Sequence, residues 1–455
     1  MLMIFKKPEI YLKRKFDAFL LDWKANPRRL PLIIKGARQV GKTECVRHFA
    51  EGRYESFIEI NFVERPQFKA VVRDGYSVES IVSNITQIDS TIRFVKGSTL
   101  LFFDELQEFP EIATALKFFA QDGNYDVILS GSLLGVHYHR VESFSVGYQT
   151  SVELRSLDFE EFLWAQGYSD EQIEDVFGWL KTRSPIPESV NETYSRHFLN
   201  YCILGGMPDV LEGYFLTKSF TGSLAVQRQI LSDYRADIRK YCEGLDPVRI
   251  QNVFDDVPFQ LAKANKKFQI SKVAPGARHK DYWGCVEWLE QAGVVLICAS
   301  LDFPELPLKA HRDRSAYKLY LADTGLLLAQ LDEEAQEDVR VRRNLGTWKG
   351  GLFENIVAEA LVKAGAELSY FKKDNSTLEM DFFLRSGDDL VPIEVKSENA
   401  RAKSLNTLIA SEHYPEIRWG IKLVHGNVGF ENNVLTMPHW SVFLLPRLLS
   451  ELKRD

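Results

Sequence analysis

Short apolar runs alternate with helical patterns over the first 155 residues. Four of these runs have the length and composition of β-strands. In three of the four the apolar residues are unbroken, which is typical of a buried strand. They are Leu30–Lys35, Ser56–Phe62, Thr99–Phe103 and Tyr125–Leu129. Helical patterns cover Tyr11–Trp23 and Glu44–Ala50. Strands that alternate with helices are typical of a parallel sheet with crossover helices, so we expect an α/β domain over residues 1–156.

The pattern changes twice more along the chain. Residues 157–245 are mainly helical, and we expect a helical lid there. Residues 246–345 show three shorter helical patterns followed by the apolar strand Gly293–Cys298, which is the order of a winged helix. Residues 346–455 are again mixed, in the order helix, three strands, helix, strand. The chain is therefore predicted to hold four units, with α/β domains at both ends.

Composition narrows the class of protein. The 455 residues include 56 basic and 63 acidic side chains, a net charge of −7, which argues against a protein that coats nucleic acid through bulk charge. No apolar stretch approaches the ~18 residues of a membrane span, and the first residues lack the features of a signal peptide. The five cysteines include no C-x-x-C pair, and His137 and His139 are more simply a chance spacing than a metal site. We expect a cytoplasmic protein with reduced thiols and no membrane contact.

A glycine-punctuated loop follows the first strand and opens a helix. It fits the pattern G-x-x-x-x-G-K-[ST], in which backbone N–H groups surround the phosphates of a nucleotide. The residues are Gly36, Ala37, Arg38, Gln39, Val40, Gly41, Lys42 and Thr43. Lys42 is predicted to reach the β- and γ-phosphates of ATP or ADP, and the Thr43 hydroxyl to bind Mg²⁺.

Two acidic residues end a later strand, as such a loop requires. Asp104 is predicted to hold the Mg²⁺, and Glu105 to polarise the attacking water as a general base. An acidic cap on the next helix is the simpler alternative. Ser130, at the end of the following strand, is a candidate sensor of the nucleotide's state, although Ser-Gly-Ser is also an ordinary turn.

A second acidic group lies near the C-terminus. Asp381 and the pair Glu394 and Lys396 match the D…E-x-K core of the PD-(D/E)XK nucleases, and Glu354 matches an additional acid on the preceding helix. In that interpretation Glu354, Asp381 and Glu394 bind a metal and Lys396 activates water. The alternative is a structural pairing of these charges in a nuclease-like fold without activity.

Several segments of the chain also resemble a known protein family, the AAA-type P-loop ATPases of bacteria and archaea. These segments are the stretch from Arg29 to Phe62, LLFFDELQEFPEI, LDFEEFLWA, LGGMPDVL, KLYLADTGLLL and GLFENIVAEAL. The resemblance implies an ATPase domain, a lid, a winged helix and a C-terminal restriction-endonuclease-like α/β domain. Family members often carry Gly-Arg where this chain has Gly147-Tyr148, so Arg140 and Arg155 are the substitute candidates for an arginine finger.

Two functions follow as hypotheses. The first is an Mg²⁺-dependent ATPase whose cycle moves the C-terminal domain and acts on DNA or RNA. The second is a nucleotide-switched scaffold with slow turnover, which the absent arginine favours. A homo-oligomer or a protein partner is expected in either case. Arg278 and Lys280 begin a helix that either contacts DNA or packs within the protein.

Overall fold

A computed structural model describes residues 11–132, 147–242, 244–331, 334–341, 343, 348–397 and 401–452. The chain forms two compact units. The first comprises residues 1–156 with 291–293, and the second comprises residues 157–290 and 294–455.

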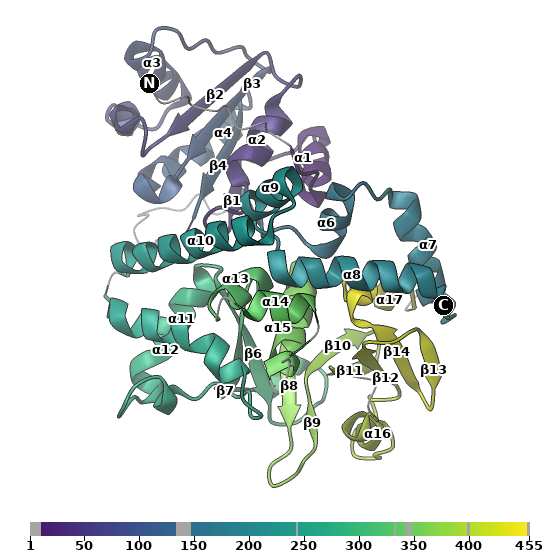
Figure 1. The fold of residues 1–455 in the computed structure, drawn as a ribbon. Helices are drawn as coiled ribbons and strands as arrows, with labels where there is room; N and C mark the ends of the chain where they lie inside the picture. The colour runs from purple at the N-terminus through teal and green to yellow at the C-terminus, as the bar shows by residue number, and fades with distance from the viewer. Residues whose placement is uncertain are drawn as a thin grey trace. The chain divides into compact units, whose positions relative to one another are not determined.

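A five-stranded parallel sheet forms the centre of the first unit (Figure 1). Its order is β2-β3-β4-β1-β5, and every pair of neighbours is parallel, as the alternation of strands and helices predicted. The strands are β1 (Leu32–Lys35), β2 (Ser56–Asn61), β3 (Thr99–Asp104), β4 (Asp126–Gly131) and β5 (Thr150–Glu153). The pattern did not predict β5, because its sequence TSVE is short, polar and largely exposed.

Helices cover both faces of this sheet. The helices α3 and α4 pack with Ile33, Leu101 and Leu129 in one core. The helices α1 and α2 contact each other through the rings of Trp23 and Phe49. The helix bounds are α1 (Lys15–Ala25), α2 (Lys42–Ala50), α3 (Val78–Ile88) and α4 (Leu116–Asp122). The first helix begins four residues later than the pattern predicted, because the Arg14 backbone N–H is capped by Asp17.

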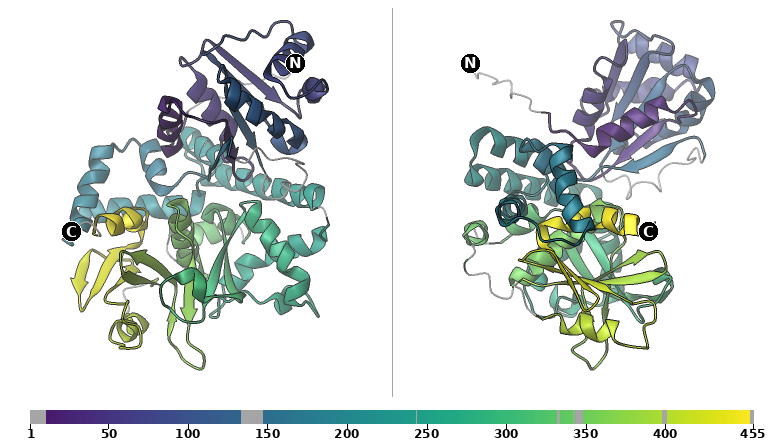
Figure 2. Two further views of the ribbon diagram at one scale, coloured as in Figure 1. Left: turned by 180° about the vertical axis from the view of Figure 1, so that it is seen from behind. Right: turned by 90° about the vertical axis from the view of Figure 1, so that its right-hand side faces the viewer.

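The second unit begins with a helical segment, as predicted from residue 157 (Figure 2). Among the described residues, every helix is too short or too polar to span a bilayer. The helices of this segment are α6 (Phe159–Ala165), α7 (Asp170–Lys181), α8 (Glu188–Leu204), α9 (Pro208–Thr217) and α10 (Phe220–Tyr241). The next helices are α11 (Pro247–Leu261) and α12 (His279–Gln291), with a turn of 3-10 helix between them at Ile270–Lys272.

A four-stranded sheet joins two segments that the sequence pattern treated as separate. The strand β6 pairs antiparallel with β7 and parallel with β8, and β9 pairs with β8. The bounds are β6 (Val295–Leu301), β7 (Arg312–Leu321), β8 (Ser369–Lys372) and β9 (Glu379–Met380). Strands from both sides of residue 346 therefore share one sheet. The domain boundaries that the sequence suggested at residues 157, 246 and 346 remain predictions.

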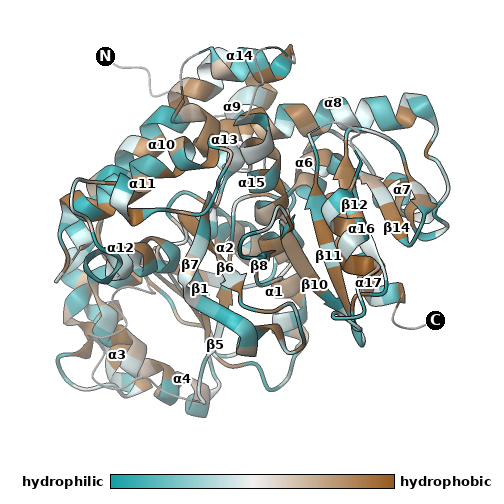
Figure 3. Cartoon of the chain, turned by 90° about the horizontal axis from the view of Figure 1, so that it is seen from below, coloured by the Kyte–Doolittle hydropathy of each residue, from teal (hydrophilic) through white to brown (hydrophobic). Residues whose placement is uncertain are grey.

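A second sheet has the order β10-β11-β12-β14-β13. Its strands β10 and β11 are strongly hydrophobic (Figure 3). The bounds are β10 (Phe382–Ser386), β11 (Asp389–Val395), β12 (Gly420–Val424), β13 (Gly429–Glu431) and β14 (Val434–Pro438). The predicted strand around Asp381 is broken at that residue, which separates β9 from β10.

Five further helices lie in the described part of the second unit. They are α13 (Thr324–Ala329), α14 (Ala335–Arg340), α15 (Trp348–Lys363) and α16 (Lys403–Ile409), and α17 (Leu445–Leu452) follows the last strand. The helix α16 buries Leu405 and Leu408 against Phe383 and Leu390 of the second sheet. The succession α15, β8, β9 with β10, β11, α16, β12 agrees with the predicted order helix, three strands, helix, strand.

A buried polar network explains several of the motifs that carried the family resemblance. The Asp323 carboxylate accepts a hydrogen bond from the Gly206 backbone N–H at 2.8 Å. Asn355 bonds the backbone of Leu321, and Glu359 accepts from the Thr324 backbone N–H at 2.7 Å. Each of these side chains satisfies backbone groups that would otherwise be buried without partners. Through these hydrogen bonds the motifs hold distant parts of the second unit together.

Candidate nucleotide site

The phosphate loop lies between the end of β1 and the start of α2. Gly36 and Gly41 have φ of 148° and 91°, a region that glycine adopts without strain. At Gly36 a side chain would also collide with the Leu154 carbonyl oxygen, just after β5. Both glycines of the motif are therefore required by the backbone itself. Ala37 and Val40 are buried, Gln39 is half-buried, and Arg38 is exposed.

Lys42 is a buried cation at the first position of α2. Its ammonium donates to the carbonyl oxygens of Gly36 at 3.0 Å and Ala37 at 2.8 Å. Burial lowers the pKa of Lys42 to about 8, although the charges of Glu105 and Asp104 act in the opposite direction. An ammonium has three N–H donors, and these two carbonyls are its hydrogen-bond partners among the described residues. The environment therefore supplies less negative charge than a buried ammonium needs.

Asp104 is the centre of a hydrogen-bond network at the carboxyl ends of the strands. One carboxylate oxygen accepts from the Thr43 hydroxyl at 2.9 Å and from the Asn61 amide at 3.4 Å. The other accepts from the Ser130 hydroxyl and from the Glu105 backbone N–H at 3.0 Å. Because β4 lies between β3 and β1, Ser130 stands between Asp104 and the phosphate loop. The structure thus brings Thr43, Asp104 and Ser130 into one cluster.

Glu105 differs from Asp104 although the two are adjacent. It has a left-handed backbone conformation, with φ of 57°, and accepts a hydrogen bond from the Gln107 amide. Burial raises its pKa, and the neighbouring charge of Asp104 raises it further. A half-buried carboxylate with a raised pKa is a stronger base than an ordinary glutamate. It does not cap the following turn through its side chain, which was the simpler alternative.

Arg14 supports the phosphate loop and was not recognised in the sequence. Its guanidinium donates to the carbonyl oxygens of Val40 at 3.1 Å and Arg155 at 2.6 Å. It therefore fastens the loop to the chain that follows β5, and it is 5% exposed. The sequence gave no motif for it, because Arg14 lies well before the loop and its contacts are with backbone atoms.

The two substitute candidates for an arginine finger, Arg140 and Arg155, remain predictions. Arg140 lies outside the described residues, as do His137 and His139. The Arg155 guanidinium forms an ion pair with Glu153 at 2.7 Å. Cys45, Cys202, Cys242, Cys285 and Cys298 are free thiols.

The structure divides the C-terminal acidic residues into two ion-paired groups. Glu394, at the end of β11, pairs with Lys396 at 2.6 Å, which is the contact that the structural alternative expected. Glu354 on α15 and Asp381 between β9 and β10 both contact a residue that sequence reasoning missed, Lys318 of β7. Among the described residues, no three His, Cys, Asp or Glu side chains are grouped to hold a metal ion.

Arg278, at the start of α12, forms an ion pair with Asp281 at 3.1 Å. Val286 and Leu289 of the same helix are fully buried. Trp283 is only partly buried. The packed face of this helix is therefore established, whereas contact of Arg278 and Lys280 with DNA remains a prediction.

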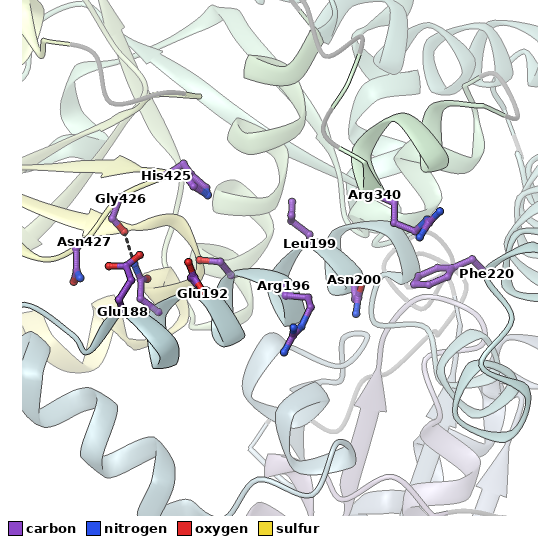
Figure 4. A pocket seen from close by; sticks show the side chains of 12 residues that line it. Glu188, Glu192, Arg196, Leu199, Asn200, Phe220, Arg340, His425, Gly426 and Asn427 are labelled. Atoms are coloured by element: carbon purple, nitrogen blue, oxygen red, sulfur yellow. Dashed lines mark hydrogen bonds between the residues drawn. The ribbon is translucent and has the colours of Figure 1, made fainter.

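A hollow of about 730 Å³ lies elsewhere in the second unit, and Figure 4 shows the side chains along it. It contains none of the site residues predicted from the sequence. In it the Asn191 amide donates to the Gly426 carbonyl oxygen at 3.1 Å. Charges of both signs line it, from Glu188, Glu192, Arg196 and Arg340.

Three family models match separate parts of the chain. Residues 28–163 match the AAA domain, and this range contains the phosphate loop, Asp104 and Ser130. Residues 195–337 and 349–440 match two domains of unknown function. No curated protein matches the chain.

Two solved structures share a similar course of the chain at low sequence identity. The Walker-type ATPase PABY2304 of Pyrococcus abyssi is 15% identical, with 70% of this chain and 96% of that chain covered and a TM-score of 0.42. The Aeropyrum pernix ORC1 protein in complex with DNA is 12% identical over 75% of this chain and 95% of that chain, with a TM-score of 0.30. These scores are too low to support an argument about function.

Proposed function

We propose that the first unit binds ATP with Mg²⁺ at the phosphate loop and hydrolyses it. The observation that carries this proposal is Lys42. A buried ammonium that donates only to carbonyl oxygens, with a lowered pKa, lacks the full counter-charge that burial demands. The β- and γ-phosphates of a nucleotide would supply that charge and accept the remaining N–H.

The residues present fit a magnesium ion. The Thr43 hydroxyl and the Asp104 carboxylate are oxygen donors 2.9 Å apart, and oxygen is the ligand that Mg²⁺ prefers. We propose that these two side chains hold the ion, directly or through water. When bound, Mg²⁺ would neutralise charge on the phosphates.

Glu105 is the residue that we propose as the general base. Its position next to Asp104 and its raised pKa support this role, and the Gln107 amide fixes its carboxylate. We propose that Ser130, which is hydrogen-bonded to Asp104, reports whether the γ-phosphate is present.

Nucleotide binding and ATPase assays on matched lysine variants test the proposal. Lys42→Ala should abolish ATP binding, whereas Lys96→Ala, the same change at an exposed position of the same unit, should leave it unaltered. Glu105→Gln should bind ATP and hydrolyse it far more slowly, by about 10²–10⁴-fold for loss of a general base. Full ATPase activity in Lys42→Ala would refute the proposal.

A nucleotide-switched scaffold with slow turnover remains the second candidate. The Arg155 guanidinium pairs with Glu153 and the family arginine is replaced by Tyr148, which favours slow hydrolysis by an isolated chain. Specific ATPase activity should then be low and should rise with protein concentration only if a homo-oligomer shares its active sites. A high rate that is independent of concentration would exclude this candidate.

For the second unit we propose a helical lid, a winged helix and a nuclease-like domain. The antiparallel pair β6 and β7 after α11 and α12 supports the winged helix, and the succession from α15 to β12 supports the nuclease-like fold. Contact with DNA or RNA would be tested by the salt dependence of any affinity.

A further inference from the structure

The acidic centre of the second unit contains a cation of its own. Lys318 lies on β7, and its side chain is only 1% exposed. Its ammonium is 3.3 Å from Glu354, 3.1 Å from Glu379 and 3.5 Å from Asp381. The ring of Tyr370 covers another side, with its centre 5.0 Å from the ammonium. Three carboxylates from three elements thus converge on one lysine.

The oxygens that a metal would require already have partners. One oxygen of Glu354 is paired with Lys266, and the other accepts from Lys318 and from the Tyr320 hydroxyl at 3.1 Å. One oxygen of Asp381 faces Lys318, and the other accepts from the Val395 backbone N–H at 2.9 Å. A divalent cation between Glu354 and Asp381 would have to displace these donors.

Cations already surround these carboxylates without a metal. Glu354, Glu379 and Asp381 lie beside Lys266, Lys318 and Lys372, the last at 3.2 Å from Glu379. Burial alone would lower the pKa of Lys318, but the three carboxylates raise it well above its ordinary value. Burial and the nearby charge of Glu354 raise the pKa of Asp381 to about 7, so near neutral pH the carboxylates carry no more charge than the three lysines, and an added divalent ion would bring two charges with no counterpart.

Glu394 and Lys396 do not change this balance. They pair with each other at 2.6 Å, and one buried oxygen of Glu394 has no hydrogen-bond partner. The motif would hold Mg²⁺ or Mn²⁺ through Glu354, Asp381 and Glu394 together, whereas only this one oxygen of Glu394 is open. The donor set that the D…E-x-K motif implies does not fit a metal here.

We propose that the Lys318 ammonium occupies the cation position between Glu354 and Asp381, so that this centre is a metal-free ion cluster that joins β7 to α15 and β9. Its function is cohesion of the second unit. Removal of Lys318 would turn the same carboxylates into a divalent-cation site.

Calorimetric titration with Mn²⁺, in the absence of nucleotide, tests both statements. The wild type and Asp381→Asn should give identical isotherms, because no metal binds at this centre. Lys318→Met keeps the length of the side chain and removes its charge, and it should gain a Mn²⁺ site that the second change Asp381→Asn removes. The matched control is Lys309→Met, an exposed lysine paired with Glu367 in the same unit.

Each result of the Mn²⁺ titrations either supports the metal-free ion cluster or contradicts it. Mn²⁺ binding by the wild type that Asp381→Asn abolishes would overturn the proposal, as would Mn²⁺-dependent cleavage of DNA or RNA that Lys396→Ala abolishes. If Lys318→Met folds and gains no site, Lys318 is not what excludes the metal. If Lys318→Met does not fold, the comparison of the wild type with Asp381→Asn still decides the first statement.

Discussion

Two buried lysines occupy opposite electrostatic situations in this protein. Lys42 donates to carbonyl oxygens and its pKa is lowered to about 8, whereas Lys318 touches three carboxylates and its pKa is raised. The first environment is short of negative charge, and the second is complete. In a site for an anionic ligand, the buried cation lacks full compensation by the negative charge of the protein. In a structural ion cluster, carboxylates of the protein itself compensate the cation.

The comparison predicts opposite effects of one substitution on stability. Lys318→Met removes the partner of three buried carboxylates and should lower the free energy of unfolding by about 3–5 kcal/mol. Lys42→Met removes a cation that burial disfavours and should leave stability unchanged or raise it. Calorimetric unfolding without nucleotide measures both, and equal losses would show that the two lysines do not differ in this way.

The lowered pKa of Lys42 predicts how nucleotide affinity depends on pH. The free protein loses the Lys42 proton above about pH 8, and a bound phosphate requires the charged form. Affinity should therefore fall above pH 8 by up to about tenfold per pH unit. Fluorescent-nucleotide titrations between pH 7 and 9.5 measure this, and Lys42→Arg, which does not titrate, should give a flat profile. A flat profile for the wild type would contradict it.

The same shift affects stability in the free protein. Between the lowered pKa and the ordinary value of 10.5, the unfolded chain binds more protons at Lys42 than the folded chain does. Stability therefore gains with rising pH across that interval through this group. Lys318 adds no pH dependence in that interval, because its raised pKa keeps it charged in both the folded and the unfolded chain. Its stabilising contribution is lost only above about pH 10.5, as the pH rises toward its folded-state pKa.

Arg14 should produce the smallest of these effects. Arg14→Ala removes one hydrogen bond to the phosphate loop, at Val40, and one to the Arg155 carbonyl that follows β5, each worth about 1.5–3 kcal/mol before the loop relaxes. We expect a loss of nucleotide affinity of about tenfold, with a smaller change in the rate at saturation. Arg14→Lys, which keeps the charge but not the two-pronged geometry, should recover part of the affinity. Unaltered affinity would limit Arg14 to a structural role.

The sequence predicted the parts of the first unit that rest on local rules. The glycine loop requires a fixed backbone geometry, and Thr43, Asp104 and Ser130 meet because the ends of parallel strands meet at one edge of the sheet. The order of the strands was not predictable in the same way, since β5 carries no apolar signal. The role of Arg14 was not predicted, because its partners are backbone carbonyl oxygens far away in the sequence.

In the second unit the sequence predicted the elements better than their chemistry. Asp381 and Glu394 were candidate site residues because each is a charged residue within an apolar strand pattern. Lys318 has the same character, in the alternating stretch from Tyr317 to Leu321, and the same reasoning would have identified it. Its partners could not be predicted, because Glu354 and Asp381 lie 36 and 63 residues further along the chain.

The sheet that crosses residue 346 has a practical consequence for dissecting the protein. A fragment that begins there would expose the edge of β8 that β6 covers, and would lose both lysines that neutralise Glu354. Such a piece would present an open strand edge and buried acid at once, which favours aggregation. The segments at residues 195–337 and 349–440, which match two separate domains of unknown function, should therefore be expressed together.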